Sequence, residues 1–216
     1  NAGSGAYAAL LADRRIRLLL LTAFLLHGGM HLGLSFAPLY LGEVYGWDRA
    51  RVGWMGSAAS TGTVVLLLTM ERFRRRFGAV PAAWLSAGSM AAHFACTIAS
   101  GTLPVQAVGF LCRGGFQSMA TLTTVAMTEA VPRARVAPAI ALLATVAAGA
   151  AIAAPPVGGW LFARTPALTF VAGIAVLALS APLVPVALRP RRTGDAARAP
   201  ARAVDQPEPL RAVHAD

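Results

Sequence analysis

Residues 136–163 read VAPAIALLATVAAGAAIAAPPVGGWLFA, and none of these 28 residues is charged. A helix needs about 20 mostly apolar residues to cross the hydrocarbon core of a bilayer. This stretch is long enough, and it lies between Arg135 and Arg164. It therefore predicts a membrane-spanning helix with a cationic group at each end.

Five further apolar stretches are separated by short gaps, and they cover residues 18–41, 52–70, 79–100, 104–128 and 167–188. The 216-residue chain is 56% hydrophobic and 13% charged, and its mean hydropathy is +0.61. Soluble domains carry about 25% charged residues. We therefore expect an all-α, polytopic membrane protein with six transmembrane helices.

The chain has nineteen arginines and no lysine, and with nine acidic residues its net charge is +10. Twelve of the arginines lie next to the spans near residues 14–17, 72–76, 133–135 and 189–192, whereas the other three gaps together hold three. Cytoplasmic segments carry such an excess, so we expect both termini in the cytoplasm. The arginines sit at membrane edges and form no single soluble basic face, which favours the lipid bilayer as a partner and argues against nucleic acid.

This pattern divides the chain into a cytoplasmic lead-in over 1–17, a transmembrane bundle over 18–188 and a tail over 189–216. The tail carries six arginines, four acids and four prolines. Such a composition is typical of a disordered segment. We expect the tail to be disordered and cytoplasmic.

Three segments carry a family resemblance: GWDRARVG at 46–53 followed after a span by ERFRRRFG at 71–78, RGGFQS at 113–118 with EAVPRAR at 129–135, and APPVGG at 154–159. In their order and spans they resemble the major facilitator superfamily of secondary transporters. Arg75 stands where that family's basic loop has an acid, and Ser118 and Ala154 each stand where it has glycine.

The resemblance covers Asp13 to Leu188 and implies an alternating-access transporter of the cell membrane, without enzyme activity or cofactor. Family members usually have two six-helix halves, so six spans imply half a transporter whose missing half is a partner. The lead-in looks like the linker that enters a second half, and a first half followed by a linker remains the alternative.

The expected cavity face is mostly Ala, Gly, Ser and Thr, with one cation. We therefore expect proton-coupled export of small amphipathic or drug-like molecules, with uptake of an organic anion or carboxylate as the alternative. Two other classes stay open, namely a non-transporting structural or sensor bundle and an intramembrane enzyme.

Arg113 lies nine residues beyond Pro104 in the fourth expected span, a depth of about 13 Å at 1.5 Å per residue. A charge there costs about 2.5 kcal/mol or more and marks a functional site by default. We expect Arg113 and Gln117, one turn apart, to line the substrate pathway together with Gly109. The partner of Arg113 is then an anionic substrate, an acid of the missing half, or backbone carbonyls in a purely structural role.

His27 and His31 are four residues apart near the middle of the first span, with Gly28 and Gly29 between them. Imidazole titrates near physiological pH, so the pair is a candidate carrier of the coupling proton. The alternative is that both side chains only hydrogen-bond to neighbouring helices. No third ligand lies at this depth, so we expect no metal site.

Four charged residues and one glycine at the expected cytoplasmic ends of the second and fourth spans are candidate gate elements by resemblance: Glu71, Arg72, Arg76, Glu129 and Gly78. In the family such pairs latch one conformation. The alternative is that the arginines only anchor the protein by the positive-inside rule.

Pro155 and Pro156 remove two backbone donors from the fifth span and predict a kink. Gly158 and Gly159 follow and allow close packing. By resemblance this element shapes the closed state, and a simple packing kink is the alternative. Pairs of small residues four apart, such as Gly29 with Gly33 and Gly53 with Ser57, also predict tight helix contacts.

Overall fold

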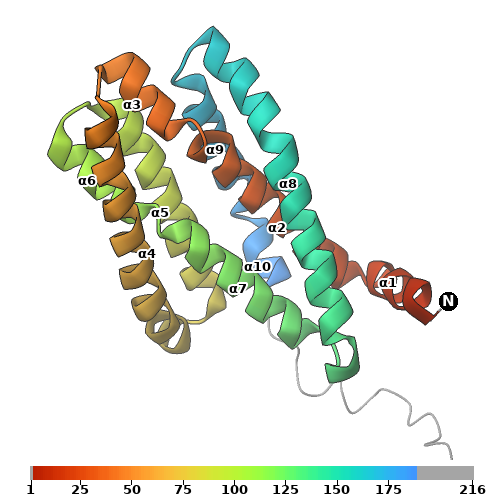
Figure 1. Cartoon of the computed structure of the whole chain (residues 1–216). Coiled ribbons are helices and arrows are strands. Elements are labelled where there is room, and N and C mark those ends of the chain that lie inside the picture. Colours follow the sequence, from red (N-terminus) through yellow and green to blue (C-terminus); the bar gives the residue numbers. More distant parts are fainter. Residues whose placement is uncertain (1, 189–216) are drawn as a thin grey trace, which may run out of the picture.

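The protein is described by a computed structural model that covers residues 2–188, with side-chain environments from Tyr7 onward. The helices are α1 (Ala2–Ala12), α2 (Arg14–Leu34), α3 (Ala37–Tyr45), α4 (Arg49–Phe77), α5 (Ala79–Ala99), α6 (Leu103–Cys112), α7 (Gly115–Ala130), the short 3-10 helix η1 (Arg133–Arg135), α8 (Val136–Arg164), α9 (Leu168–Ser180) and α10 (Leu183–Ala187). Residues 2–188 contain no strand. The expected all-α membrane bundle is confirmed (Figure 1).

Within the described residues, three helical segments are long and apolar enough to cross a membrane: Arg14–Tyr45, Arg49–Phe77 and Arg133–Arg164. The other three expected spans are also helical, as α5, as α6 with α7, and as α9 with α10. Taken singly, these helices do not reach the same standard of length and hydropathy.

Three of the expected spans between residues 2 and 188 are each split into two helices, at residues 35–36, 113–114 and 181–182. Pro38 begins α3, and Pro182 precedes α10. Proline lacks a backbone donor and favours such helix starts. The break at Arg113 and Gly114 has no proline, and the packing that holds it is described below.

Helix α2 lies at the centre of the fold, packed between α8 and α9 (Figure 1). Glycines allow the close contact with α9, because a Cβ atom on Gly33 would come within 2.9 Å of the Phe170 ring and one on Gly29 within 3.1 Å of Val176. The close approach expected for Gly29 and Gly33 is confirmed. The expectation for Gly53 is wrong, because no atom of the described structure lies within 4 Å of a Cβ there.

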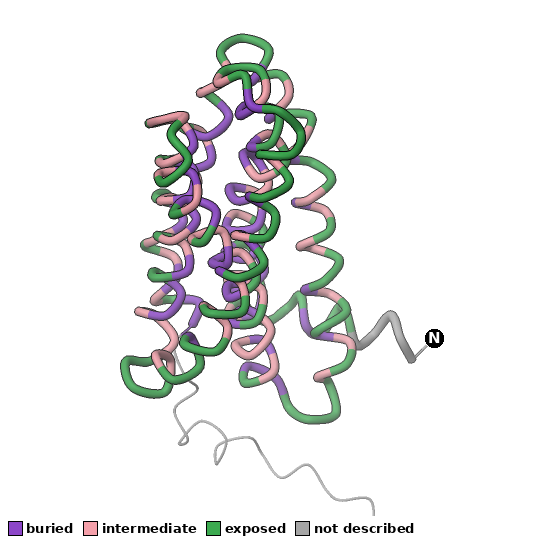
Figure 2. Tube along the Cα trace, turned by 60° about the vertical axis from the view of Figure 1, so that its left-hand side comes forward, coloured by how far each residue is buried: buried purple, intermediate pink, exposed green. Residues whose placement is uncertain are grey.

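Buried residues follow the interior of the bundle, and the outer surfaces are largely exposed (Figure 2). The most apolar window of the first span is 56% buried, whereas the windows of α4 and α8 are each 17% buried. Helices α4 and α8 therefore present most of their apolar surface outward.

The lead-in contains a helix, α1, which was not expected. Its Leu10 is 1% exposed and packs in a cluster with Ile16 and Leu143. Lead-in and bundle therefore touch. The tail expected over 189–216 lies outside the described residues.

Candidate functional site

The backbone of the fourth span changes its hydrogen bonding at Arg113. The Arg113 amide donates to the Phe110 carbonyl at 3.2 Å and the Phe116 amide to the Arg113 carbonyl at 3.1 Å. In a continuous α-helix these amides would bond four residues back. The carbonyls of Gly109 and Cys112 thereby lose their usual helical donors.

Helix α5 supplies donors to both carbonyls. The His93 Nδ1 atom lies 3.0 Å from the Gly109 oxygen, and the Ser89 hydroxyl donates a short hydrogen bond to the Cys112 oxygen. A carbonyl only accepts, so Nδ1 must carry the proton. The opposite nitrogen of His93 is buried and has no hydrogen-bond partner within the described structure. We call Ser89 and His93 the α5 clasp.

Glycines let three backbones meet at this break. A Cβ atom on Gly62 of α4 would overlap the Leu111 carbonyl, and one on Gly114 would come within 2.5 Å of the Gly62 oxygen. A Cβ atom on Gly115 would overlap the Ser86 carbonyl. The break is therefore a packed part of the bundle, held between α4 and α5.

Arg113 and Gln117 open into one recess of about 340 Å³ between α4 and the broken span. Its other lining residues are Leu34, Gly56, Ala59, Ser60, Thr63 and Phe116. No acid is among them. The guanidinium of Arg113 has no ion pair or hydrogen bond with any residue from 2 to 188 for which contacts are described. The expected pairing of Arg113 and Gln117 on one cavity is thus seen, but Gly109 is buried against Cys96 of α5 instead.

The two histidines of α2 do not line this recess, but both contact Phe116, which does. Its ring lies edge-on to His27 at a centroid distance of 5.9 Å and to His31 at 5.1 Å. His27 is 5% exposed, and His31 is partly exposed. Phe116 therefore lies between the histidine pair and the recess of Arg113 and Gln117, and a shared role of the four residues stays a prediction. Phe116 could not be identified from the sequence, because an aromatic residue in an apolar span carries no signal of such a role.

The charged end of α4 differs in detail from the expected gate. Glu71 accepts from Arg74 Nε at 2.8 Å and from Arg75 Nε at 2.7 Å. A third pair joins Arg74 Nη1 to Glu129 Oε1 at 3.8 Å. Arg74 therefore bridges α4 and α7. Arg72 and Arg76 form no ion pair within the described residues, and their role in a gate with Glu129 stays a prediction.

Hydrogen bonds from Arg74 and Arg75 lower the pKa of Glu71 to about 2, and the bond to Glu71 raises the pKa of Arg74. Glu71 is therefore the acid that complements this basic loop, although Arg75 stands at the family's acidic position.

Gly78 ends α4 with φ of 93°, a conformation that side chains of L residues rarely adopt. In the fifth span, α8 continues as one helix through Pro155 and Pro156. A Cβ atom on Gly158 would come within 2.7 Å of the Leu32 oxygen, whereas Gly159 has only ordinary contacts with Phe36. Close packing against α2 is therefore a property of Gly158, and the kink stays a prediction.

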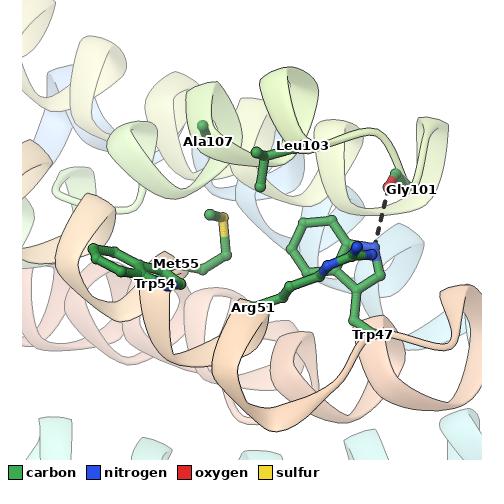
Figure 3. Close-up of a pocket in the computed structure, with 7 residues that line it drawn as sticks. All are labelled: Trp47, Arg51, Trp54, Met55, Gly101, Leu103 and Ala107. Atoms are coloured by element: carbon green, nitrogen blue, oxygen red, sulfur yellow. Dashed lines mark hydrogen bonds between the residues drawn. The ribbon is translucent and has the colours of Figure 1, made fainter.

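A second recess, of about 660 Å³, lies at the other end of α4. It is lined by Trp47, Arg51, Trp54, Met55, Gly101, Leu103 and Ala107 (Figure 3). The Trp47 indole donates to the Gly101 carbonyl at 3.1 Å. From the sequence alone, Arg51 is expected only as a charge in the gap before the second span. Within the described residues, no cluster of three His, Cys, Asp or Glu side chains could hold a metal ion.

One comparison with known proteins identifies a family. The family model described as Major Facilitator Superfamily matches residues 19–214, which is most of the chain. No curated protein matches the chain.

Proposed function

The chain belongs to the major facilitator superfamily, and from this premise we propose that it forms half of a proton-coupled exporter of small amphipathic molecules that carry an anionic group. It is a multi-pass membrane protein in a family of secondary transporters. The proposal concerns the substrate class, the coupling ion and the direction of transport.

The observation that carries the proposal is the unpaired guanidinium of Arg113 in the recess of α4 and the broken span. A buried or half-buried cation is stabilised only by a partner, and no acidic side chain lines this recess. Gln117, Ser60 and Thr63 add polar groups beside apolar Phe116 and Leu34. A solute with an anionic end and an apolar body complements this lining.

The histidine pair supports the coupling proposal. His27 and His31 both touch the ring of Phe116, and Phe116 also lines the recess. Imidazoles bind and release protons near physiological pH. A solute in the recess and a proton on this pair would therefore share one neighbour.

The bare faces of α4 and α8 support a second six-helix half as the partner. Their apolar windows are only 17% buried within this chain. In alternating access two bundles rock about a site near the midplane, so the half would cover Arg113 as well. The arginine bias supports a cytoplasmic position for Arg74 and Glu129, and for both termini, in the cell membrane.

The test uses proteoliposomes that contain this chain with its complementary half. Flux of a panel of carboxylated and cationic amphipathic dyes is followed with and without a pH gradient. We expect carboxylated dyes to move, Arg113→Ala to abolish the flux with unchanged membrane expression, and Arg113→Lys to retain part of it. Arg135→Ala, an exposed arginine outside the recess, is the matched control.

Wild-type flux in Arg113→Ala would remove Arg113 from the mechanism. Uptake of an organic anion is the second candidate, favoured by the same guanidinium. The two differ in the direction of flux under the same gradient. With an acidic outside, proton-coupled export moves the dye out of the vesicle, whereas proton-coupled uptake moves it in. Flux of no solute by the two halves together would favour a structural or sensor bundle.

A further inference from the structure

The recess between the start of α4 and the start of α6 is separate from the site around Arg113. It lies at the opposite end of α4 from the Arg74–Glu129 pair, where both helices begin. Successive residues of an α-helix are about 100° apart around its axis. Arg51 and Met55 therefore lie on one face of α4, and Gly56, Ser60 and Thr63 lie on another. The recess therefore opens away from the transport site.

One end of this recess holds a cation that has no ion-pair partner among the described residues. Figure 3 shows Arg51 at the same end as Trp47 and Gly101, with Trp54 at the other. Asp48 is occupied as the cap of α4, where it accepts from the Arg51 backbone amide at 2.8 Å. The Arg51 side chain makes no ion pair in the described part of the chain. Arg51 is also the one charged residue among those that line the recess.

The rest of the recess is apolar and faces outward. Trp54 is 72% exposed and Leu103 is 55% exposed, with Met55 and Ala107 between them. The same face of α4 continues away from this end with the exposed side chains of Val65 and Leu68. A ligand here can place a charged group at Arg51 and an extended apolar chain along α4.

We propose that this recess binds a phospholipid with an anionic headgroup, with its phosphate at Arg51 and an acyl chain along Met55, Leu103 and Ala107. The charge of Arg51 selects an anion. The apolar walls select a lipid over a small soluble phosphate, which would gain nothing from Trp54 or Leu103. Tryptophan and arginine near span ends are typical of the headgroup level of a bilayer.

The chain offers its own reporter. Two of its four tryptophans, Trp47 and Trp54, line the recess. In the variant Trp84→Phe/Trp160→Phe all tryptophan emission comes from this site. The full chain is placed in phosphatidylcholine bilayers with a rising fraction of phosphatidylglycerol that has brominated acyl chains, which quench tryptophan on contact. Brominated phosphatidylcholine in place of the phosphatidylglycerol is the reference.

We expect phosphatidylglycerol to bind about fivefold better than phosphatidylcholine, which corresponds to ~1 kcal/mol for one arginine at a headgroup. Arg51→Gln abolishes this preference. Arg49→Gln is the matched control, since it removes the same charge two residues away but does not line the recess. It keeps the preference.

Three outcomes overturn the proposal. Equal loss in Arg49→Gln and Arg51→Gln would show a general surface attraction. Relief of quenching by millimolar glycerol phosphate would show a site for soluble anions. Absence of quenching by either lipid would show that protein covers the recess. If the two-tryptophan variant does not fold, both arginine variants are made with all four tryptophans kept and are studied in detergent. Added phosphatidylglycerol should then raise the thermal unfolding midpoint of Arg49→Gln but not that of Arg51→Gln.

Discussion

His93 of α5 donates through Nδ1 to the Gly109 carbonyl across 3.0 Å, four residues before Arg113 in the broken fourth span. One turn earlier on the same face of α5, Ser89 serves the Cys112 carbonyl in the same way. The two side chains take the place of the backbone amides that would donate to these carbonyls in a continuous helix. The position of Arg113 thus depends on a neighbouring helix as well as on its own.

Removing one donor of the α5 clasp should destabilise the break. Ser89→Ala leaves the Cys112 carbonyl without its side-chain donor, and an unsatisfied buried carbonyl costs about 1–3 kcal/mol. We expect a lower thermal midpoint in detergent and faster hydrogen–deuterium exchange over residues 109–116. Ser57→Ala, at an exposed serine of α4, is the control. Unchanged exchange in Ser89→Ala would show that the break does not need the clasp.

Two glycines of α4 should respond oppositely to alanine. At Gly62 the new methyl group would overlap the Leu111 backbone, and overpacking of this kind costs about 1–3 kcal/mol or more. At Gly53 no atom lies within 4 Å of the added group, so Gly53→Ala should be neutral or stabilise the helix by up to ~1 kcal/mol. Thermal unfolding of both variants decides. Equal midpoints would contradict the backbone contact at Gly62.

The histidine pair should set the pH dependence of transport. His27→Gln/His31→Gln should flatten the pH profile of flux in proteoliposomes, because glutamine keeps polarity but cannot take a proton. Met30→Leu lies between them on the same helix and should leave the profile unchanged. A double variant with the wild-type profile would end the proton role of the pair.

The ion pair between α4 and α7 should couple Arg74, and not Arg72, to Glu129. Exposed pairs contribute about 0.2–1 kcal/mol, and Glu129 keeps 57% side-chain exposure. A double-mutant cycle with Arg74→Gln and Glu129→Gln should show coupling in that range. The parallel cycle with Arg72→Gln should show none, and coupling there would return Arg72 to the gate.

The Glu71 cluster should not respond to pH in the physiological range. The folded pKa of Glu71 is lowered from 4.5 to about 2 by Arg74 and Arg75. A lowered carboxyl pKa stabilises the folded state fully above the unfolded value and loses this effect as pH falls toward the folded value. The difference in unfolding midpoint between wild type and Glu71→Gln should be constant from about pH 6 to 8 and shrink below about pH 4.5. A change near pH 7 would contradict this assignment.

The spans could be predicted from the sequence because length and hydropathy decide them. The second predicted span, 52–70, lies within α4, and the fifth matches α8 to within one residue. The breaks were harder. Pro38 and Pro182 mark two of them, yet α8 runs through Pro155 and Pro156 unbroken. Whether a helix opens depends on neighbours that can serve the freed carbonyls, as His93 and Ser89 do at Arg113.

The site was predicted in part. Depth and charge identify Arg113, and spacing identifies Gln117 and the histidine pair. The rotation of a helix about its axis decides which arginine of a basic run meets an acid on another helix. The sequence does not show this rotation, so it does not tell which of the three arginines at 74–76 faces that acid. Arg74 was therefore missed, and Phe116 was missed because its role consists of contacts with a helix distant in sequence.

The ring of Phe116 lines the recess and also contacts the imidazoles of His27 and His31. Under the proposed function, a solute that enters beside Arg113 would press on this ring or push it aside, and either movement would alter how much water reaches His27 and His31. Occupancy of the recess by a solute would then affect protonation of the two histidines through the single side chain of Phe116, without any rearrangement of the helices. Under that proposal, coupling of this kind would be present within this chain alone, before the proposed second half moves against it.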